Sequence, residues 1–181
     1  ATVTVNGQTY TATITGSAPT YSWSANVTPA LGNGTYNVSL AITDAAGNTG
    51  TDSTSNELTI SNTIPTVALS TPSLPSRTND TTPTFTGTVS VAAPATLSQL
   101  QISLNDGAWQ TITDITGTNW TYTAPAFGEG ALTIALQATD SLGNTTGTLT
   151  QTGTLTIDTT APTGTITSLI TSDTTPALSG T

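Results

Sequence analysis

The stretch "WSANVTPALGNGTYNVSLAITDAAGNTG" (residues 23–50) recurs along the chain as "WTYTAPAFGEGALTIALQATDSLGNTTG" (residues 120–147), and the two tryptophans lie 97 positions apart. In both copies apolar and polar residues alternate over short runs, as they do in strands that bury one face. Neither copy has the apolar spacing of an amphipathic helix. A β-rich segment that recurs at this distance indicates a tandem array of similar domains.

The similarity continues on both sides of this stretch. Residues 57–66 ("ELTISNTIPT") match residues 154–163 ("TLTIDTTAPT") at a spacing of 97, and residues 79–88 ("NDTTPTFTGT") match residues 172–181 ("SDTTPALSGT") at 93. Asn6-Gly7 and Asn105 to Gly107 are hairpin signals, because Asn and Gly tolerate the positive φ of tight turns. About seven short strands per repeat predict an all-β fold of antiparallel β-sandwich domains.

The composition excludes several classes of function. Ten acidic residues and a single basic one, Arg77, give a formal net charge of −9. One cation cannot neutralise a row of phosphates, so we expect no nucleic-acid binding. No apolar run approaches the roughly 18 residues of a membrane span, so no direct membrane insertion is expected.

Catalysis is not expected either. The chain contains no Cys, His or Met, which rules out disulfides, zinc sites and thiol or imidazole chemistry. Pairs of carboxylates can hydrolyse glycosides, but no acidic pair recurs where strands would form a cleft. We predict that the chain is not an enzyme.

The motifs "TIDTTAPT", "NDTTPTFTGT" and "ITDAAGNTG" resemble the bacterial immunoglobulin-like (Ig-like) repeats of large secreted adhesins and biofilm-associated proteins. The resemblance covers essentially the whole chain. It implies tandem Ig-like sandwiches on the bacterial cell surface, with neighbouring repeats of the same chain as partners. In several members of that family calcium is held by Asp residues at domain junctions.

The repeat divides the chain into three parts. Residues 62–158 are expected to form a complete Ig-like domain, residues 1–61 the last five strands of a preceding domain, and residues 159–181 the first two strands of a following one. The strands of the complete domain, lettered A to G, are expected at residues 67–70, 84–89, 97–104, 109–112, 120–123, 131–138 and 147–157. The sequence therefore looks like an excerpt of a longer secreted protein.

Asp44 and Asp140 each begin a D-x-x-G-N loop between strands F and G. One interpretation is a turn, in which the carboxylate caps the local backbone while Gly and Asn adopt left-handed conformations. The other is that each Asp is a calcium ligand at a domain junction.

A second acidic group is formed by Asp80, Glu129 and Asp158. In a seven-stranded sandwich the A–B loop, the E–F loop and the exit of strand G share one end. Three carboxylates there repel one another unless a cation lies between them, and calcium accepts six to eight oxygen ligands in loose geometry. The alternative is that these acids are solvated surface charges.

The two junctions differ in charge. Ser61 stands where Asp158 stands in the second junction, and Asn33 replaces Glu129. Neutral oxygen ligands bind calcium more weakly than carboxylates. We therefore predict that calcium binds at the Asp158 junction in preference to the Ser61 junction.

These observations favour a structural function, as extender repeats of a surface adhesin that calcium stiffens at the junctions. The alternative is an Ig-like binding module for a carbohydrate or a host protein. Trp23 and Trp120 are compatible with both, since aromatic residues serve as core or interdomain packing or as platforms for sugars.

The incomplete domains also predict self-association. Strands A and B of one copy complement the C-to-G part of the next, which gives a head-to-tail contact by strand complementation.

Overall fold

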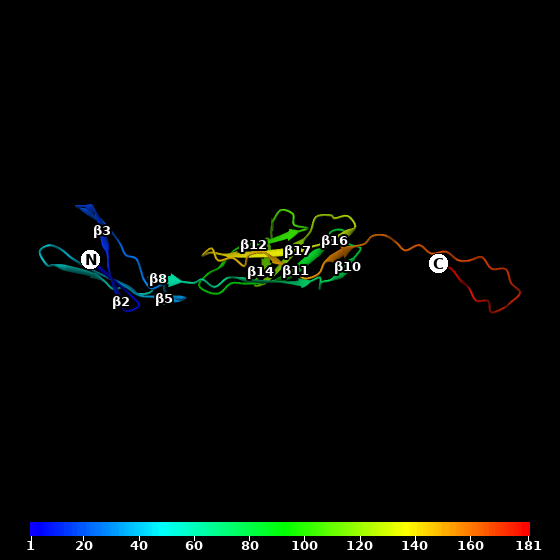
Figure 1. Cartoon of the computed structure of the whole chain (residues 1–181), viewed down its shortest axis with the longest axis horizontal. Coiled ribbons are helices and arrows are strands. Elements are labelled where there is room, and N and C mark those ends of the chain that lie inside the picture. Colours follow the sequence, from blue (N-terminus) through cyan, green and yellow to red (C-terminus); the bar gives the residue numbers. More distant parts are fainter. The chain divides into compact units, whose positions relative to one another are not determined.

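A computed structural model describes residues Ala1–Thr181 as strands, turns and extended segments, with no helix (Figure 1). None of its segments is therefore a helix that could cross a membrane. The chain divides into two compact units, one comprising Ala1–Val67, Val89–Leu100 and Gln137–Gly147, the other Ala68–Thr88, Gln101–Leu136 and Thr148–Thr181.

Residues 1–60 form three small antiparallel sheets, with the strand orders β2-β1-β6-β7, β3-β4 and β5-β8. The strands are β1 (Thr2–Val5), β2 (Gln8–Thr11), β3 (Thr13–Ser17), β4 (Thr20–Ser24), β5 (Gly34–Tyr36), β6 (Val38–Thr43), β7 (Thr49–Asp52) and β8 (Leu58–Ile60). The β1–β2 hairpin turns at Asn6 and Gly7, whose φ angles are 50° and 74°. This is the left-handed conformation expected for the Asn-Gly signal.

The core of this part is small. Val3, Val5 and Ala12 are buried, and the partly buried side chains around them include Tyr10, Val27, Leu40 and Leu58. Val3 and Val5 alternate along β1 with the more exposed Thr2 and Thr4, as in a strand with one buried face.

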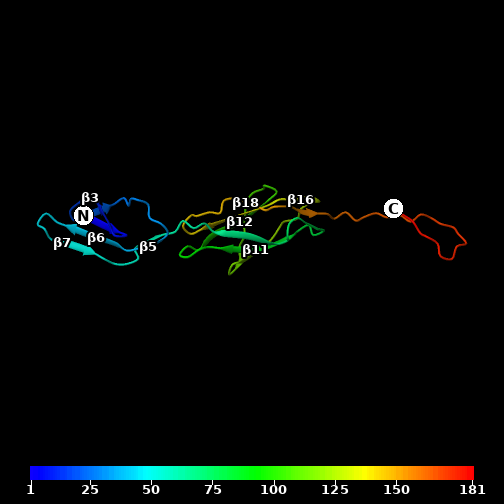
Figure 2. The same cartoon turned by 60° about the horizontal axis from the view of Figure 1, so that its bottom comes forward.

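Residues 66–157 form three further sheets, with the orders β14-β15-β11-β9, β13-β12-β17-β18 and β10-β19-β16. β11, β12, β16 and β18 are labelled in Figure 2. The strands are β9 (Thr66–Thr71), β10 (Ser76–Thr78), β11 (Thr84–Ser90), β12 (Leu97–Leu104), β13 (Gln110–Thr111), β14 (Asp114–Thr116), β15 (Asn119–Thr123), β16 (Gly130–Leu132), β17 (Ile134–Asp140), β18 (Leu149–Thr150) and β19 (Leu155–Ile157). The predicted all-β sandwich fold is confirmed.

Large apolar side chains fill the core of this second part. Those that are almost fully buried are Phe85, Leu100, Ile102, Trp120, Ile134, Leu136, Leu155 and Ile157. Along β11, Phe85, Gly87 and Val89 are buried while Thr84 and Thr88 are exposed. The period of two in the sequence therefore corresponds to the two faces of the strand.

The structure refines several predicted strands. The residues expected as strand D contain β13, which pairs with β12, and the pairing with β15 comes instead from β14. The expected strands F and G are each broken into two strands that belong to different sheets. β10 lies between the expected strands A and B, where no strand is predicted, and it pairs in parallel with β19.

The sheets of residues 1–60 correspond to those of residues 66–157 with three strands missing. β2-β1-β6-β7 corresponds to β13-β12-β17-β18, β3-β4 to β14-β15, and β5-β8 to β16-β19. The additional strands in the second part are β9, β10 and β11. The division of the chain at residues 61 and 158 stays a prediction.

Residues 158–181 contain no strand and are drawn without arrows (Figure 1). Their pairing is limited to a bridge between Ile166 and Gly180. The backbone N–H of Thr165 donates to the Thr181 carbonyl oxygen at 2.7 Å, and the Thr181 N–H donates back to the Thr165 carbonyl oxygen at 3.2 Å. The two strands expected here are therefore reduced to a short paired segment.

Candidate functional site

The D-x-x-G-N loop after β17 is organised around the Asp140 carboxylate. Its Oδ1 accepts hydrogen bonds from the backbone N–H groups of Leu142 (2.9 Å) and Asn144 (2.8 Å), and its Oδ2 accepts one from Asn144 Nδ2 (2.9 Å). Gly143 has a φ of 86°, a conformation in which a Cβ would be strained. The polar groups of the motif therefore form their hydrogen bonds with one another inside the loop.

The loop after β6 repeats this arrangement. Asp44 Oδ1 accepts from the N–H groups of Ala46 and Asn48, and Asp44 Oδ2 accepts from Asn48 Nδ2, each at 2.9 Å. Gly47 has a φ of 89°. The turn interpretation accounts for every residue that the motif specifies.

The two carboxylates differ in burial. Asp140 is 2% exposed, whereas Asp44 lies at the surface. Burial acts to raise the pKa of Asp140, but the hydrogen bonds from Asn144, Leu142 and Gly143 outweigh it, so the pKa lies below its ordinary value. The side-chain hydrogen bond from Asn48 is the largest cause that lowers the pKa of Asp44. Both groups are held as carboxylates by N–H donors.

Glu129 lies in the loop between β15 and β16 and contacts the residues by which the chain leaves β19. Its Oε1 accepts hydrogen bonds from the Thr159 hydroxyl (2.6 Å), the Thr160 hydroxyl (2.6 Å) and the Thr159 backbone N–H (3.1 Å). The Thr159 hydroxyl, followed by that of Thr160, lowers the pKa of Glu129. This side chain thus fixes Thr159 and Thr160, which follow β19 directly after Asp158.

Asn33 fixes the residues after β8 in the same way, but with a neutral amide group in place of a carboxylate. The Asn62 backbone N–H donates to Asn33 Oδ1, and Asn33 Nδ2 donates to the Thr63 hydroxyl, each at 2.9 Å. We call these two arrangements, at Asn33 and at Glu129, the linker clamps. Sequence reasoning compared these positions only as stronger and weaker calcium ligands.

A signal for the clamps is nevertheless present in the sequence. Asn33 and Glu129 both lie between two glycines, as "GNG" (32–34) and "GEG" (128–130). Gly34 and Gly130 have φ angles of 159° and 135°. Glycine adopts such angles without strain, so the repeated G-x-G pattern marks corresponding loop positions, and in the structure each carries a hydrogen-bonding side chain.

The remaining predicted ligands each have partners in the chain. Asp80 Oδ1 accepts from the Thr82 N–H (2.8 Å) and hydroxyl (3.1 Å), which is a local turn. Asp158 Oδ2 lies 3.7 Å from the Arg77 guanidinium, and both side chains are largely solvated. The exposed ion pair contributes little to stability.

The structure gathers no group of three acidic side chains suited to a metal ion. The carboxylates predicted to meet at one end of the domain are instead engaged by hydroxyl, amide and guanidinium groups. Their arrangement does not fit a calcium cage as it stands. Calcium binding by Asp44, Asp80, Glu129, Asp140 and Asp158 stays a prediction.

A further hydrogen bond joins the buried loop to the linker before it. Asn144 Nδ2 donates to the Ser61 carbonyl oxygen at 3.2 Å as well as to Asp140. Both residues belong to the same compact unit. The loop that the sequence analysis considered for metal binding therefore also holds a linker residue.

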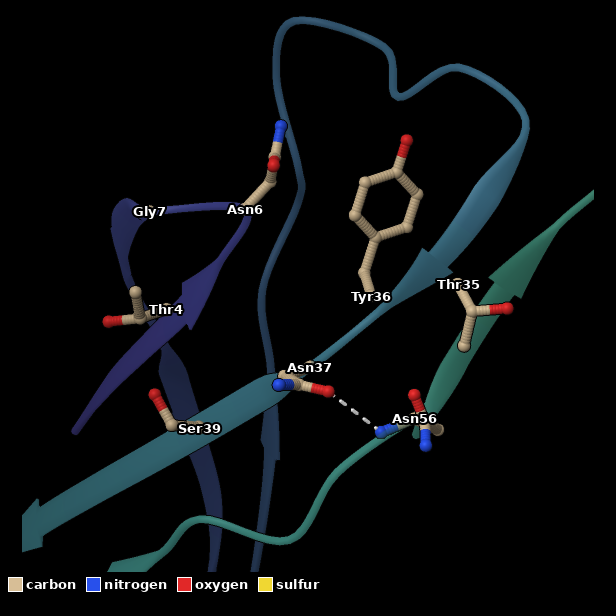
Figure 3. Close-up of a pocket in the computed structure, with 8 residues that line it drawn as sticks. All are labelled: Thr4, Asn6, Gly7, Thr35, Tyr36, Asn37, Ser39 and Asn56. Atoms are coloured by element: carbon tan, nitrogen blue, oxygen red, sulfur yellow. Dashed lines mark hydrogen bonds between the residues drawn. The ribbon is translucent and has the colours of Figure 1, made fainter.

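A polar groove of about 580 Å³ is lined by Thr4, Asn6, Gly7, Thr35, Tyr36, Asn37, Ser39 and Asn56 (Figure 3). Thr4 and Ser39 are register partners on β1 and β6. Within the groove the Asn37 side-chain oxygen accepts from the Asn56 N–H at 2.9 Å, and the Tyr36 hydroxyl donates to the Gly32 carbonyl oxygen at 3.0 Å. Sequence reasoning missed this groove because its residues come from three separate segments, residues 4–7, 35–39 and 56.

Residues 72–159 match the model of the family described as bacterial Ig-like domain. No curated protein is detectably similar to the chain in sequence.

Three solved structures are similar at low identity. The fibronectin(III)-like modules of Clostridium thermocellum CbhA are 15% identical, with a TM-score of 0.44 over 86% of this chain and 76% of that chain. Bacteroides ovatus SGBP-B of the mixed-linkage glucan utilization locus, solved with a mixed-linkage heptasaccharide, is 18% identical, with a TM-score of 0.30 over 86% and 39%. Dimeric latent PorU of Porphyromonas gingivalis is 14% identical, with a TM-score of 0.40 over 91% and 20%. These TM-scores are too low to support an argument about function.

Proposed function

Because residues 72–159 belong to the bacterial Ig-like domain family, we propose that the chain consists of extender repeats of a large bacterial surface adhesin. In this function the repeats hold a ligand-binding region of the adhesin away from the cell. The observation that carries the proposal is the linker clamp, which recurs at Asn33 and Glu129. A spacer needs a fixed direction of the chain where it leaves each domain, and the clamps supply it.

The clamps act on the residues that would otherwise bend most freely. Thr159 and Thr160 follow the last strand directly, and three hydrogen bonds from them converge on one Glu129 oxygen. Holding a backbone segment in one conformation costs conformational entropy, which the hydrogen bonds to Glu129 offset. Stiff joints between domains are therefore built from side chains of the chain itself.

The composition suits such a spacer. With ten acids and one base, the chain offers almost no cation to anionic macromolecules. The absence of Cys suits export without disulfide formation. This function places the chain outside the cell, secreted or attached at the bacterial surface, in cell adhesion and biofilm formation.

Calcium is not required by this proposal. The linker clamps fix the linkers through hydrogen bonds alone, and the exposed carboxylates near Asp158 already have partners. Calcium at that junction would add stiffness and would be detected as a change in linker dynamics on chelation.

The test is a distance measurement across the first linker. The chain has no cysteine, so Gln8→Cys and Gln110→Cys, both at exposed positions, place two spin labels uniquely. We expect a narrow distance distribution that broadens in Asn33→Ala, because the clamp on residues 62 and 63 is lost. Ser17→Ala, at an exposed strand position, is the control. A distribution already as broad as that of a chain with a Gly/Ser linker would rule out the spacer function.

A second candidate function is an Ig-like module that binds a carbohydrate, and the polar groove near Asn6 favours it. Amide and hydroxyl side chains provide both donors and acceptors, as neutral sugars require. A titration with neutral oligosaccharides followed by NMR would shift the signals of Tyr36 and Asn56 first. Shifts scattered over the whole chain, or none, would eliminate this candidate.

A further inference from the structure

Two asparagines are followed directly by glycine, Asn6 by Gly7 and Asn33 by Gly34, and the sequence contains no other Asn-Gly pair. Glycine has no Cβ, so its backbone nitrogen is unshielded and reaches the side-chain carbonyl carbon of the asparagine before it. The two pairs therefore have the same intrinsic reactivity. Their surroundings in the folded chain decide how fast each of them reacts.

Asn6 is free to react. It is exposed at the tip of the β1–β2 hairpin, and it shares no hydrogen bond with the other residues that line the polar groove (Figure 3). A Cβ at Gly7 would meet no atom, so the space around the attacking nitrogen is open. The same hairpin tip in residues 66–157, at Asn105, is exposed as well. The exposure therefore belongs to the hairpin and not to the smaller core of residues 1–60.

Asn33 is also exposed, but its linker clamp holds the side chain. Its Oδ1 accepts from the Asn62 N–H and its Nδ2 donates to the Thr63 hydroxyl, each at 2.9 Å. Both hydrogen bonds must open before the side-chain carbonyl carbon can turn toward Gly34. A reaction that needs a locally opened conformation is slowed by the low population of that conformation.

Asn105, the hairpin counterpart of Asn6, is protected in two ways. Its Oδ1 accepts from the Thr133 N–H at 2.9 Å, and the residue that follows is Asp106, whose side chain shields the backbone nitrogen. The three asparagines thus form a series. Asn6 is free and followed by glycine, Asn33 is held and followed by glycine, and Asn105 is held and followed by a larger residue.

We infer that Asn6 is a site of spontaneous covalent modification. The Gly7 backbone nitrogen loses its proton to water and bonds to the Asn6 Cγ, while the bond from Cγ to Nδ2 breaks and ammonia leaves with a proton taken from water. Water then adds to either carbonyl carbon of the succinimide ring that results, and it opens the ring to aspartate or to isoaspartate. The sum consumes one water and releases one ammonia, with no oxidation or reduction.

The modification changes the polar groove, to which Asn6 and Gly7 belong. All the residues that line this groove are uncharged, so the new carboxylate is the first charge among them. Isoaspartate also adds a methylene to the backbone of the turn between Val5 and Gln8, which are register partners. The groove therefore becomes anionic as the chain ages, at a rate that the hairpin sets without an enzyme.

The experiment incubates the full folded chain at neutral and mildly alkaline pH and follows each asparagine by peptide mass spectrometry. Deamidation is detected by its mass change, and chromatography separates isoaspartate from aspartate. Because two hydrogen bonds must open at Asn33, we expect Asn6 to react about tenfold faster or more. Asn105 should be slower than both.

Two controls separate the fold from the local sequence. In urea the clamp is lost while both Asn-Gly pairs remain, so the rates at Asn6 and Asn33 should converge. Thr63→Val removes the hydroxyl that binds Asn33 Nδ2, at an exposed position. It should raise the rate at Asn33 and leave the rate at Asn6 unchanged, and circular dichroism checks that the variant is folded.

Two results would overturn the inference. One is an Asn6 that reacts in urea but not in the folded chain, because the turn itself would then be protective. The other is an Asn33 that reacts as fast as Asn6 in the folded chain, or that is not accelerated by Thr63→Val, because the clamp would then not distinguish the two sites.

Discussion

Residues 1–60 and residues 66–157 share a repeated sequence and corresponding sheets, yet one part has an open core and the other a closed one. The difference is the presence of β9, β10 and β11 in the second part. With these strands Trp120 is buried, and without them Trp23 remains accessible. Burial of a repeated residue is therefore decided by strands far away in sequence, not by its own neighbours.

The two D-x-x-G-N loops also differ in burial, since Asp140 is buried and Asp44 is exposed. Their internal hydrogen bonds agree within 0.1 Å, as between Asn48 N–H and Asp44 (2.9 Å) and between Asn144 N–H and Asp140 (2.8 Å). The local conformation is thus independent of burial. In the buried loop, Asn144 also donates to the Ser61 carbonyl oxygen.

The largest expected effect is that of Phe85→Ala in β11. Removing a fully buried phenylalanine costs about 3–5 kcal/mol of the free energy of unfolding. The repeat counterpart, Leu178→Ala, should leave the stability of the dilute chain nearly unchanged, because this side chain is exposed. Chemical unfolding followed by circular dichroism measures both. Equal effects of the two substitutions would mean that the two positions do not differ as the structure shows.

A smaller loss of the free energy of unfolding is expected from Gly87→Ala. The added Cβ meets the Ala68 backbone and the Trp120 ring, and overpacking of this kind costs typically 1–3 kcal/mol. Gly50→Ala is the matched control, because a Cβ there has open space around it. Thermal unfolding of the two variants should separate them clearly, and an unchanged Gly87→Ala would show that β11 shifts to make room.

Next in size is the effect of Asp140→Asn. The amide keeps one acceptor oxygen, so its N–H₂ would face either the backbone N–H groups of Leu142 and Asn144 or the side-chain N–H₂ of Asn144, at a position that is 2% exposed. We expect a lower melting temperature and faster amide exchange at Asn144. Asp44→Asn, in the exposed copy of the loop, should change exchange at Asn48 much less. The reverse order would contradict the role assigned to burial.

The smallest effect is the pH dependence of the clamps. Because the pKa of Glu129 is lowered from its ordinary 4.5 in the folded chain, its ionised form stabilises the clamp above that value. The stabilisation is lost as the pH falls below 4.5 through the lowered pKa. Amide order at Thr159 and Thr160 should then fall, as NMR relaxation would show. Asn62 and Thr63, held by the uncharged Asn33, provide the internal control and should not respond.

The sequence predicted the strands correctly wherever apolar and polar residues alternate regularly. β12 coincides with its predicted range of residues 97–104, and β11 and β15 were placed within one residue. β10 was missed because its three residues carry no pattern of their own and pair only with β19, far along the chain. Pairing of this kind is decided by the tertiary fold.

The candidate site was predicted in part. The turn interpretation of Asp44 and Asp140 follows from the motif, and the structure shows all of its hydrogen bonds. The role of Glu129 could not be derived in the same way, because a carboxylate serves equally as a metal ligand and as an acceptor for hydroxyls. Its partners lie 30 and 31 residues further on, so only the fold could choose between them.

The linker clamps have a consequence for how arrays of such domains change in length. Each clamp joins a loop of one domain to the first residues that leave it, and Asn33 and Glu129 show that different side chains serve. At the first linker the hold comes from both sides, because Asn33 binds residues 62 and 63 from upstream while Asn144 binds the Ser61 carbonyl oxygen from downstream. A repeat that replaces its neighbour would therefore keep this junction only if it carries both the G-x-G side chain and the D-x-x-G-N loop.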